Sequence, residues 1–112
     1  MGKITVVDVD DAEVPEQDFV ESRRVVRKEH GAESMSFNVT TLHVGYDDPD
    51  VVYPDHDEVV YILTGKIEFT ANGETQTLGP GKAMYIPRGQ SYGYKVIDGP
   101  NNVIAVFTPG KF

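Results

Sequence analysis

The sequence predicts an all-β protein, either a sandwich or a barrel of short strands. Runs rich in β-branched and aromatic residues recur along the 112 residues, and clusters of Gly, Pro and Asn separate them. No stretch of useful length repeats its apolar residues with the period of a helix. The dipeptide Asn72-Gly73 predicts a tight hairpin, because both central positions of a type I′ turn need positive φ.

The N-terminal part is expected to form an edge strand, a loop and a charged strand. Residues 4–9 are a short β-branched run, and residues 10–18 are acidic and contain Pro15. Residues 21–29 hold four basic side chains around Val25-Val26, which predicts a strand with solvated charge on one side. The alternative is a carboxylate clamp, since Arg can hold a carboxylate through two parallel hydrogen bonds.

The rest of the chain alternates between strand and turn signals. Residues 36–44 are rich in strand formers and predict a long strand, followed by an acidic loop over residues 45–50. Gly, Pro and Asn turns then separate the remaining predicted strands. These strands cover residues 59–63, 66–70, 74–78, 83–86, 91–97 and 103–107.

The stretch from Tyr53 to Gly65 carries the main chemical signal. His56 and Glu58 come just before the apolar run, and alternate residues of a strand share a face. We therefore expect His56 and Glu58 to project to the same side as Val60 and Ile62. Such a pair could supply two metal ligands, or a base with an orienting carboxylate. His56 could instead form only a local hydrogen bond at the entrance of the strand.

Composition limits the possible functions. The chain has 18 acidic and 10 basic residues, and a net charge of −8 argues against a nucleic-acid or membrane partner. The absence of cysteine excludes disulfides, Cys-ligated zinc and thiol nucleophiles. The N-terminus has no long apolar run, so neither a signal peptide nor a transmembrane segment is expected. The expected location is the cytoplasm.

Two segments resemble the two conserved motifs of the cupin superfamily. The first runs from Glu58 to Gly65, the second from Gly79 to Gly89 with Tyr92 after it, and the Asn72-Gly73 hairpin lies between them. The resemblance implies a double-stranded β-helix, or jelly-roll barrel, with a pocket inside it. It further implies one cupin domain over residues 1–112, with the N-terminal edge strand and acidic loop in residues 1–20 and the barrel in residues 21–109. Cupins commonly pair into homodimers, and an edge strand over residues 4–9 would benefit from such a partner.

The chain departs from the usual metal signature of cupins. The positions that usually carry the metal-binding histidines are Val52, Pro54 and Tyr92, and only Glu58 remains from the usual set. A narrower resemblance is to ectoine synthases, whose Tyr-x-x-His-x-Glu spacing matches Tyr53, His56 and Glu58. Ethanolamine-utilisation cupins are a second relative by pattern.

The ectoine synthase resemblance implies a set of site residues. In that family a glutamate, a tyrosine and a histidine hold the metal; Glu58 and Tyr85 match the first two, whereas the histidine falls near Gly93 and is absent. With His56 as a third candidate, Glu58, Tyr85 and His56 are the predicted catalytic residues and the predicted ligands of one divalent metal, Fe or Zn. The predicted substrate-binding residues are Thr40, Tyr53, Tyr92 and Phe107. Tyr85 and Tyr92 could alternatively only line the pocket.

Three functions for a small-molecule cupin follow. The first is a lyase or cyclase acting on a small polar substrate, with loss of water on ring closure, as the resemblance to ectoine synthases implies. The second is a non-catalytic ligand-binding cupin with a degenerate metal site. The third is metal-free acid–base catalysis by Glu and Tyr. In each case the expected partners are a small molecule and a second copy of the chain.

Overall fold

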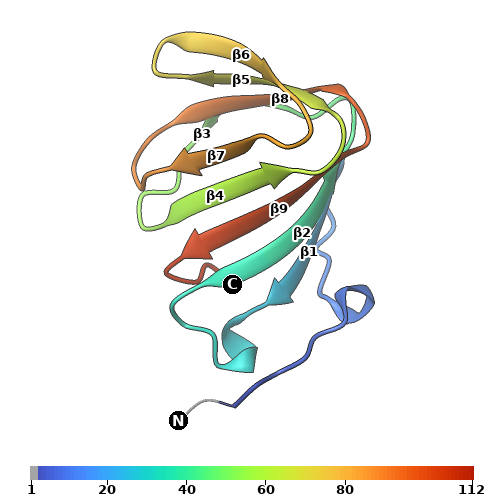
Figure 1. Cartoon of the computed structure of the whole chain (residues 1–112), viewed down its shortest axis with the longest axis vertical. Coiled ribbons are helices and arrows are strands. Elements are labelled where there is room, and N and C mark those ends of the chain that lie inside the picture. The colour runs from blue at the N-terminus through green and yellow to red at the C-terminus, as the bar shows by residue number, and fades with distance from the viewer. Residues whose placement is uncertain (1–2) are drawn as a thin grey trace.

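The computed structural model describes residues 3–112 as two facing sheets (Figure 1). All strand pairs are antiparallel. The first sheet has the order β1 (Val20–Val26), β2 (Ser36–Leu42), β9 (Asn101–Thr108), β4 (Asp57–Ile62) and β7 (Ala83–Ile86). The second has the order β3 (Asp47–Val51), β8 (Tyr92–Asp98), β5 (Lys66–Ala71) and β6 (Glu74–Leu78). This jelly roll confirms the predicted all-β class.

The core lies between the two sheets because the strands alternate buried and outward-facing residues. Along β4, Glu58, Val60 and Ile62 are buried while Val59 and Tyr61 are exposed. Ile62 of the first sheet and Ile67 of the second are both fully buried, in one apolar cluster that joins the two sheets. The predicted hairpin is also present, since Asn72 and Gly73 both have positive φ between β5 and β6.

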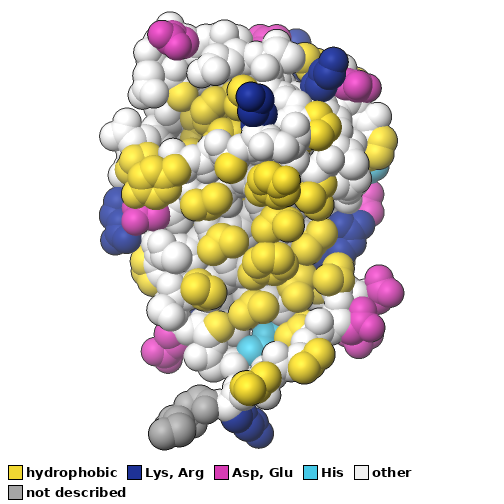
Figure 2. Space-filling model, viewed as in Figure 1, with side chains coloured by type: hydrophobic (Ala, Val, Ile, Leu, Met, Phe, Trp, Pro, Cys, Tyr) yellow, Lys and Arg dark blue, Asp and Glu magenta, His cyan; other side chains and the backbone are white. Residues whose placement is uncertain are grey.

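The outer face of the five-stranded sheet is apolar (Figure 2). The register aligns outward-facing side chains of β2, β9, β4 and β7 into two rows across the strands. One row consists of Phe37, Val106, Val59 and Tyr85. The other consists of Val39, Ile104, Tyr61 and Ala83. Neither row contains a charged residue.

The predicted N-terminal edge strand is wrong. Residues 4–8 have no regular structure, and the side chain of Ile4 is 98% exposed. A 3-10 helix, η1 (Val9–Asp11), follows, and the segment meets β1 only through one isolated bridge between Glu13 and Arg24. A β-branched run forms a strand only where it finds a partner and packs one face, and this run finds neither.

Two further boundaries differ from the sequence prediction. Residues 47–51 form β3 instead of a loop, because Asp47 and Asp48 pair with Lys95 and Tyr94 of β8. Pro49 is tolerated there because β3 lies at the edge of its sheet. The charged strand ends at Val26 and is followed by η2 (Lys28–His30).

Within residues 3–112, no helix has the length and apolar character needed to span a membrane.

Candidate functional site

A cavity of about 180 Å³ opens between the two sheets. Strands of both sheets and the C-terminal segment line it, and its polar side chains include Asn38, Thr40, Tyr53, Glu58 and Tyr92. Asn38, Thr40, Glu58 and Tyr92 face inward by strand parity, because each lies on the same face of its strand as other buried residues. Tyr53 reaches the cavity from the connection between β3 and β4.

Glu58 is the buried carboxylate of this cavity. Its side chain is 5% exposed, and its Oε1 accepts a hydrogen bond from the Tyr92 hydroxyl at 2.8 Å. Burial raises the pKa of Glu58 to about 7, against the lowering effects of the Tyr92 hydrogen bond and the Lys111 charge. Burial and the neighbouring Glu58 raise the pKa of Tyr92, which therefore stays protonated. Near neutral pH, Glu58 can thus both donate and accept a proton.

The four residues predicted to bind substrate all line the cavity. Phe107 of β9 is the direct cross-strand partner of Glu58, and the Tyr53 ring meets the Phe107 ring edge-on at 5.0 Å between centroids. Burial raises the pKa of Tyr53, so its hydroxyl is available as a donor. Thr40 donates to the Ser22 hydroxyl at 3.3 Å. Their role in binding stays a prediction.

His56 lies outside the cavity lining. It precedes β4, where a turn at residues 54–55 ends the alternation of the strand. Its Nδ1 lies 2.8 Å from the carbonyl oxygen of Pro109, and since a carbonyl can only accept, Nδ1 carries the hydrogen. His56 therefore holds the C-terminal segment, 53 residues away in the sequence, and not only a neighbouring group at the entrance of the strand.

Tyr85 faces away from Glu58. It pairs with Val59 on the outer face of the sheet and is 66% exposed, whereas its neighbours Met84 and Ile86 point inward. The predicted metal set of Glu58, Tyr85 and His56 does not converge, and this prediction is wrong in its geometry. Among residues 3–112, no three His, Asp or Glu side chains cluster closely enough to hold a metal ion. The donors present do not fit the predicted Fe or Zn site.

Asn38 and Arg24 also line the cavity, although neither was predicted as a site residue. Asn38 is 3% exposed, and its Oδ1 is buried without a hydrogen-bond partner. The sequence carried a signal for both, because Asn38 shares strand parity with Thr40, and Arg24 belongs to the basic cluster for which a carboxylate clamp was the alternative.

Lys111 had no signal in the sequence. It lies beyond the predicted end of the barrel, in the segment that folds back over the cavity through hydrogen bonds to Ser36 and Glu33. Its Nζ lies 4.7 Å from the ring centroid of Tyr53 and 4.5 Å from that of Phe112. Cation–π contacts of this kind hold an ammonium in place without neutralising it.

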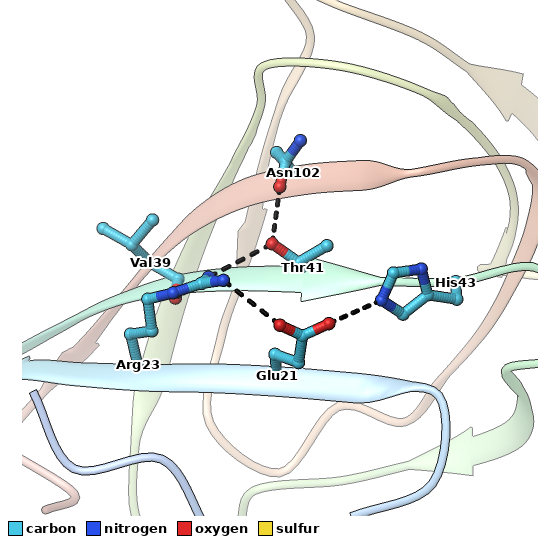
Figure 3. Close-up of polar contacts among 6 residues, drawn as sticks. All are labelled: Glu21, Arg23, Val39, Thr41, His43 and Asn102. Carbon is cyan, nitrogen blue, oxygen red and sulfur yellow. Dashed lines mark hydrogen bonds and ion pairs between the residues drawn. The ribbon is translucent and has the colours of Figure 1, made fainter. Parts of the chain in front are cut away.

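A second polar cluster lies on the opposite face of the first sheet (Figure 3). Glu21 receives contacts from His43 at 2.7 Å and Arg23 at 3.4 Å, and Arg23 also donates to Thr41 at 3.1 Å. Thr41 in turn donates to Asn102 at 2.6 Å. Arg23 therefore belongs to this outer network, while Arg24, one residue later on β1, belongs to the cavity.

Arg88 at the rim is also engaged within the protein. Its backbone and side chain bind the Asp57 carboxylate, at 2.9 Å from the backbone nitrogen and 3.2 Å from Nε. These hydrogen bonds lower the pKa of Asp57. Arg88 therefore links the turn after β7 to the start of β4, and Arg24 and Lys111 remain as the cations of the cavity lining.

Comparisons with known proteins support the fold. Among solved structures, the chain is similar to ectoine synthase from P. lautus at 21% identity, covering 96% of this chain and 79% of that one with a TM-score of 0.85. It is similar to the polyketide cyclase RemF from Streptomyces resistomycificus at 21% identity, covering 96% and 80% with a TM-score of 0.77. It is also similar to a putative ethanolamine utilization protein from Salmonella typhimurium at 21% identity, covering 95% and 86% with a TM-score of 0.73.

At these identities the structural likeness establishes the fold alone. No curated protein matches the sequence. The family comparison matches residues 38–107, more than half of the chain, to the Cupin domain family. This matched region runs from Asn38 in β2 to Phe107 in β9 and includes Glu58 and Tyr92. The chain therefore belongs to the cupin family.

Proposed function

We propose that this protein is a small-molecule cupin in which Glu58 and Tyr92 carry out acid–base chemistry inside the cavity. The observation that supports this is the buried Glu58 carboxyl, hydrogen-bonded at 2.8 Å to the Tyr92 hydroxyl, with its pKa raised to about 7. A general acid or base works best when its pKa lies near the working pH. The proposed acid–base chemistry uses only the Glu58 and Tyr92 side chains and requires no bound metal.

The reaction class that suits this pair is a dehydration with ring closure, as in a lyase. An amine or carbon nucleophile of the substrate attacks its own carbonyl carbon, and a water molecule is lost. Tyr53 carries a protonated hydroxyl that can donate a hydrogen bond to the carbonyl oxygen. Glu58, held by the Tyr92 hydroxyl, takes the protons from the attacking nucleophile one at a time and delivers them to the carbonyl oxygen, which leaves as water. Similarity to ectoine synthase and to a polyketide cyclase supports cyclisation as the class to test.

The test is a survey of N-acylated diamino acids by mass spectrometry, with loss of one water as the signal. We expect turnover by the wild type, with and without a chelator, and a fall of about 100-fold or more in Glu58→Gln, the lower range for removing a general acid or base. Glu74→Gln, at an exposed position of β6, is the matched control and should keep full activity. A folded wild type that turns over none of these compounds, or a chelator that abolishes turnover, would contradict the proposal.

A binding cupin without catalysis is the second candidate. It is favoured by Val52, Pro54 and Tyr92 at the positions where cupins usually carry metal-binding histidines, and by the lone carboxylate in the cavity lining. Calorimetry separates the two candidates. Equal ligand affinity in wild type and Glu58→Gln, without turnover in either, supports the binding protein, whereas turnover that depends on Glu58 supports the enzyme.

A further inference from the structure

Two cations meet at one end of the cavity, and each lies against the Phe112 ring. The guanidinium carbon of Arg24 lies 3.8 Å from the ring centroid, and Nζ of Lys111 lies 4.5 Å from it. Both side chains line the cavity. We refer to this part of the cavity, formed by Arg24, Lys111 and Phe112, as the cationic end.

The two cations have one ion pair between them, and it is long. Within residues 3–112, no carboxylate lies within 4.0 Å of Nζ of Lys111. Arg24 reaches Glu13 only at 4.0 Å, and the other oxygen of Glu13 is bound by Arg27 at 2.5 Å. Nε of Arg24 is buried without a partner. In a chain with a net charge of −8, two neighbouring cations that share a single ion pair at 4.0 Å need an explanation.

The positive charges of Arg24 and Lys111 repel each other. Burial first, and the Arg24 charge second, lower the pKa of Lys111, while the Glu58 charge raises it. The aromatic rings around Lys111 stabilise its ammonium but supply no negative charge. An anion placed between Arg24 and Lys111 would remove this repulsion, and Arg presents two parallel donors that match a planar carboxylate.

Unused acceptors lie deeper in the same cavity. Asn38 of β2 and Glu58 of β4 flank β9, where their cross-strand partners are Ala105 and Phe107. Oδ1 of Asn38 is buried without a donor, and Glu58 accepts a hydrogen bond from the Tyr92 hydroxyl at Oε1. A buried carbonyl oxygen without a hydrogen bond is costly, so this region is suited to a ligand group that donates.

We propose that the cavity takes a short molecule with a carboxylate at one end and an amine or hydroxyl at the other. The carboxylate lies at the cationic end between Arg24 and Lys111, and the donor group reaches Asn38 and Glu58. The volume of about 180 Å³ is below the roughly 300–1,000 Å³ of common ligand pockets, which limits the molecule to a short one. This inference rests on the proposed small-molecule function and names its ligand class.

Nuclear magnetic resonance titration of the full chain tests the proposal, with γ-aminobutyrate as the probe and γ-aminobutyramide as the matched ligand, which keeps the ammonium group but has an uncharged amide in place of the carboxylate. We expect the acid to shift the backbone signals of Arg24 and Lys111 and to bind about tenfold or more tightly than the amide, the usual effect of one charged hydrogen bond. Lys111→Gln and Arg24→Gln should each weaken acid binding by a similar factor. Lys82→Gln, at an exposed lysine, should leave it unchanged.

Three results would overturn the ligand class: no binding of the acid at millimolar concentration, equal binding of acid and amide, or unchanged acid binding in both cavity variants. The same spectra show whether each variant is folded, and Arg24→Lys provides a second variant that keeps the charge but loses the planar pair of donors. If only the amide binds, the cavity is still a small-molecule site, but the proposed preference for a carboxylate is wrong. Binding of the acid without any dehydration activity would remove the proposed enzyme and leave the carboxylate site.

Discussion

The raised pKa of Glu58 follows from its position on the inner face of β4. Val60 and Ile62 follow it on the same face of β4 and are part of the apolar core, so the carboxyl group is held at the inner end of an apolar row. Removal from water favours the neutral acid, and a single hydrogen bond from Tyr92 compensates only in part. The same residue on the outer face, at the position of Val59 or Tyr61, would be an ordinary surface carboxylate.

The raised pKa of Glu58 makes the stability of the fold depend on pH. Between the ordinary value of 4.5 and about 7 the folded protein binds more protons at Glu58 than the unfolded chain does, so stability falls as pH rises through this window. The contribution is roughly 3 kcal/mol. Glu58→Gln, which cannot ionise, should therefore gain stability relative to wild type by up to this amount from about pH 5 to about pH 8.

Urea unfolding at both pH values measures this difference. Glu74→Gln serves as the control, because its side chain is exposed on β6 and its substitution should change the two free energies equally. A Glu58→Gln difference that stays constant with pH would show that Glu58 ionises normally in the folded protein.

Strand parity decides which site residues could be predicted from the sequence. Glu58 and Phe107 follow the alternation of their strands and lie in the cavity, as expected. Tyr85 was assigned by its place before a turn, and parity contradicts that assignment because Ile86, the cross-strand partner of Glu58, faces inward. Lys111 could not be predicted, since it reaches the cavity through the path of the C-terminal segment and not through any strand.

At the scale of the elements, the link between β4 and β5 depends on a close backbone approach at Gly65. Its φ is +81°, and a Cβ there would lie 2.7 Å from the Asp98 carbonyl oxygen and 2.8 Å from Cα of Asn101. Both contacts are with the backbone of the β8–β9 connection, which cannot rotate away. The same connection is anchored by Asn101, whose side chain donates to the Thr64 carbonyl at 2.9 Å.

Gly65→Ala should therefore destabilise the fold more than another glycine substitution with the same backbone conformation. Gly89 also has φ of +81°, but a Cβ there meets nothing within 4 Å. We expect Gly89→Ala to cost about 1 kcal/mol for the left-handed conformation. Gly65→Ala should cost at least about 2 kcal/mol more, because the backbone must shift. Chemical denaturation measures both values, and equal costs would mean that the connection after β8 yields easily.

The elements that could be predicted are those with a local cause. Asn72-Gly73 specifies its hairpin through backbone conformation, and the alternating strands specify their buried faces. By contrast, β3 forms from Asp and Pro residues because β8 offers a free edge, and residues 4–8 form no strand because no partner is present. Whether β3 and residues 4–8 form strands depends on pairing with distant segments. The local residue types of one sequence do not reveal such pairing.

At the scale of the whole molecule, the homodimer stays a prediction, and the apolar outer face of the five-stranded sheet is a candidate surface for it. The edge strand once expected to pair does not exist, but the two rows across β2, β9, β4 and β7 present aliphatic and aromatic side chains without a charge (Figure 2). Two copies with a net charge of −8 each repel over most of their surfaces. A charge-free face is where this repulsion is weakest and apolar burial can outweigh it, so we propose a second copy as its occupant.

A single charge on this face should separate the copies without unfolding them. Val59 and Ile97 are 41% and 42% exposed, but Val59 lies within the apolar rows and Ile97 on β8 of the other sheet. We expect the wild type to sediment as a dimer, Ile97→Glu to remain one, and Val59→Glu to become a monomer, because a two-fold interface brings both new carboxylates into one apolar contact. Sedimentation velocity measures the three masses, and circular dichroism checks the fold. A monomeric wild type would contradict the dimer, and a dimeric, folded Val59→Glu would place the interface on another face.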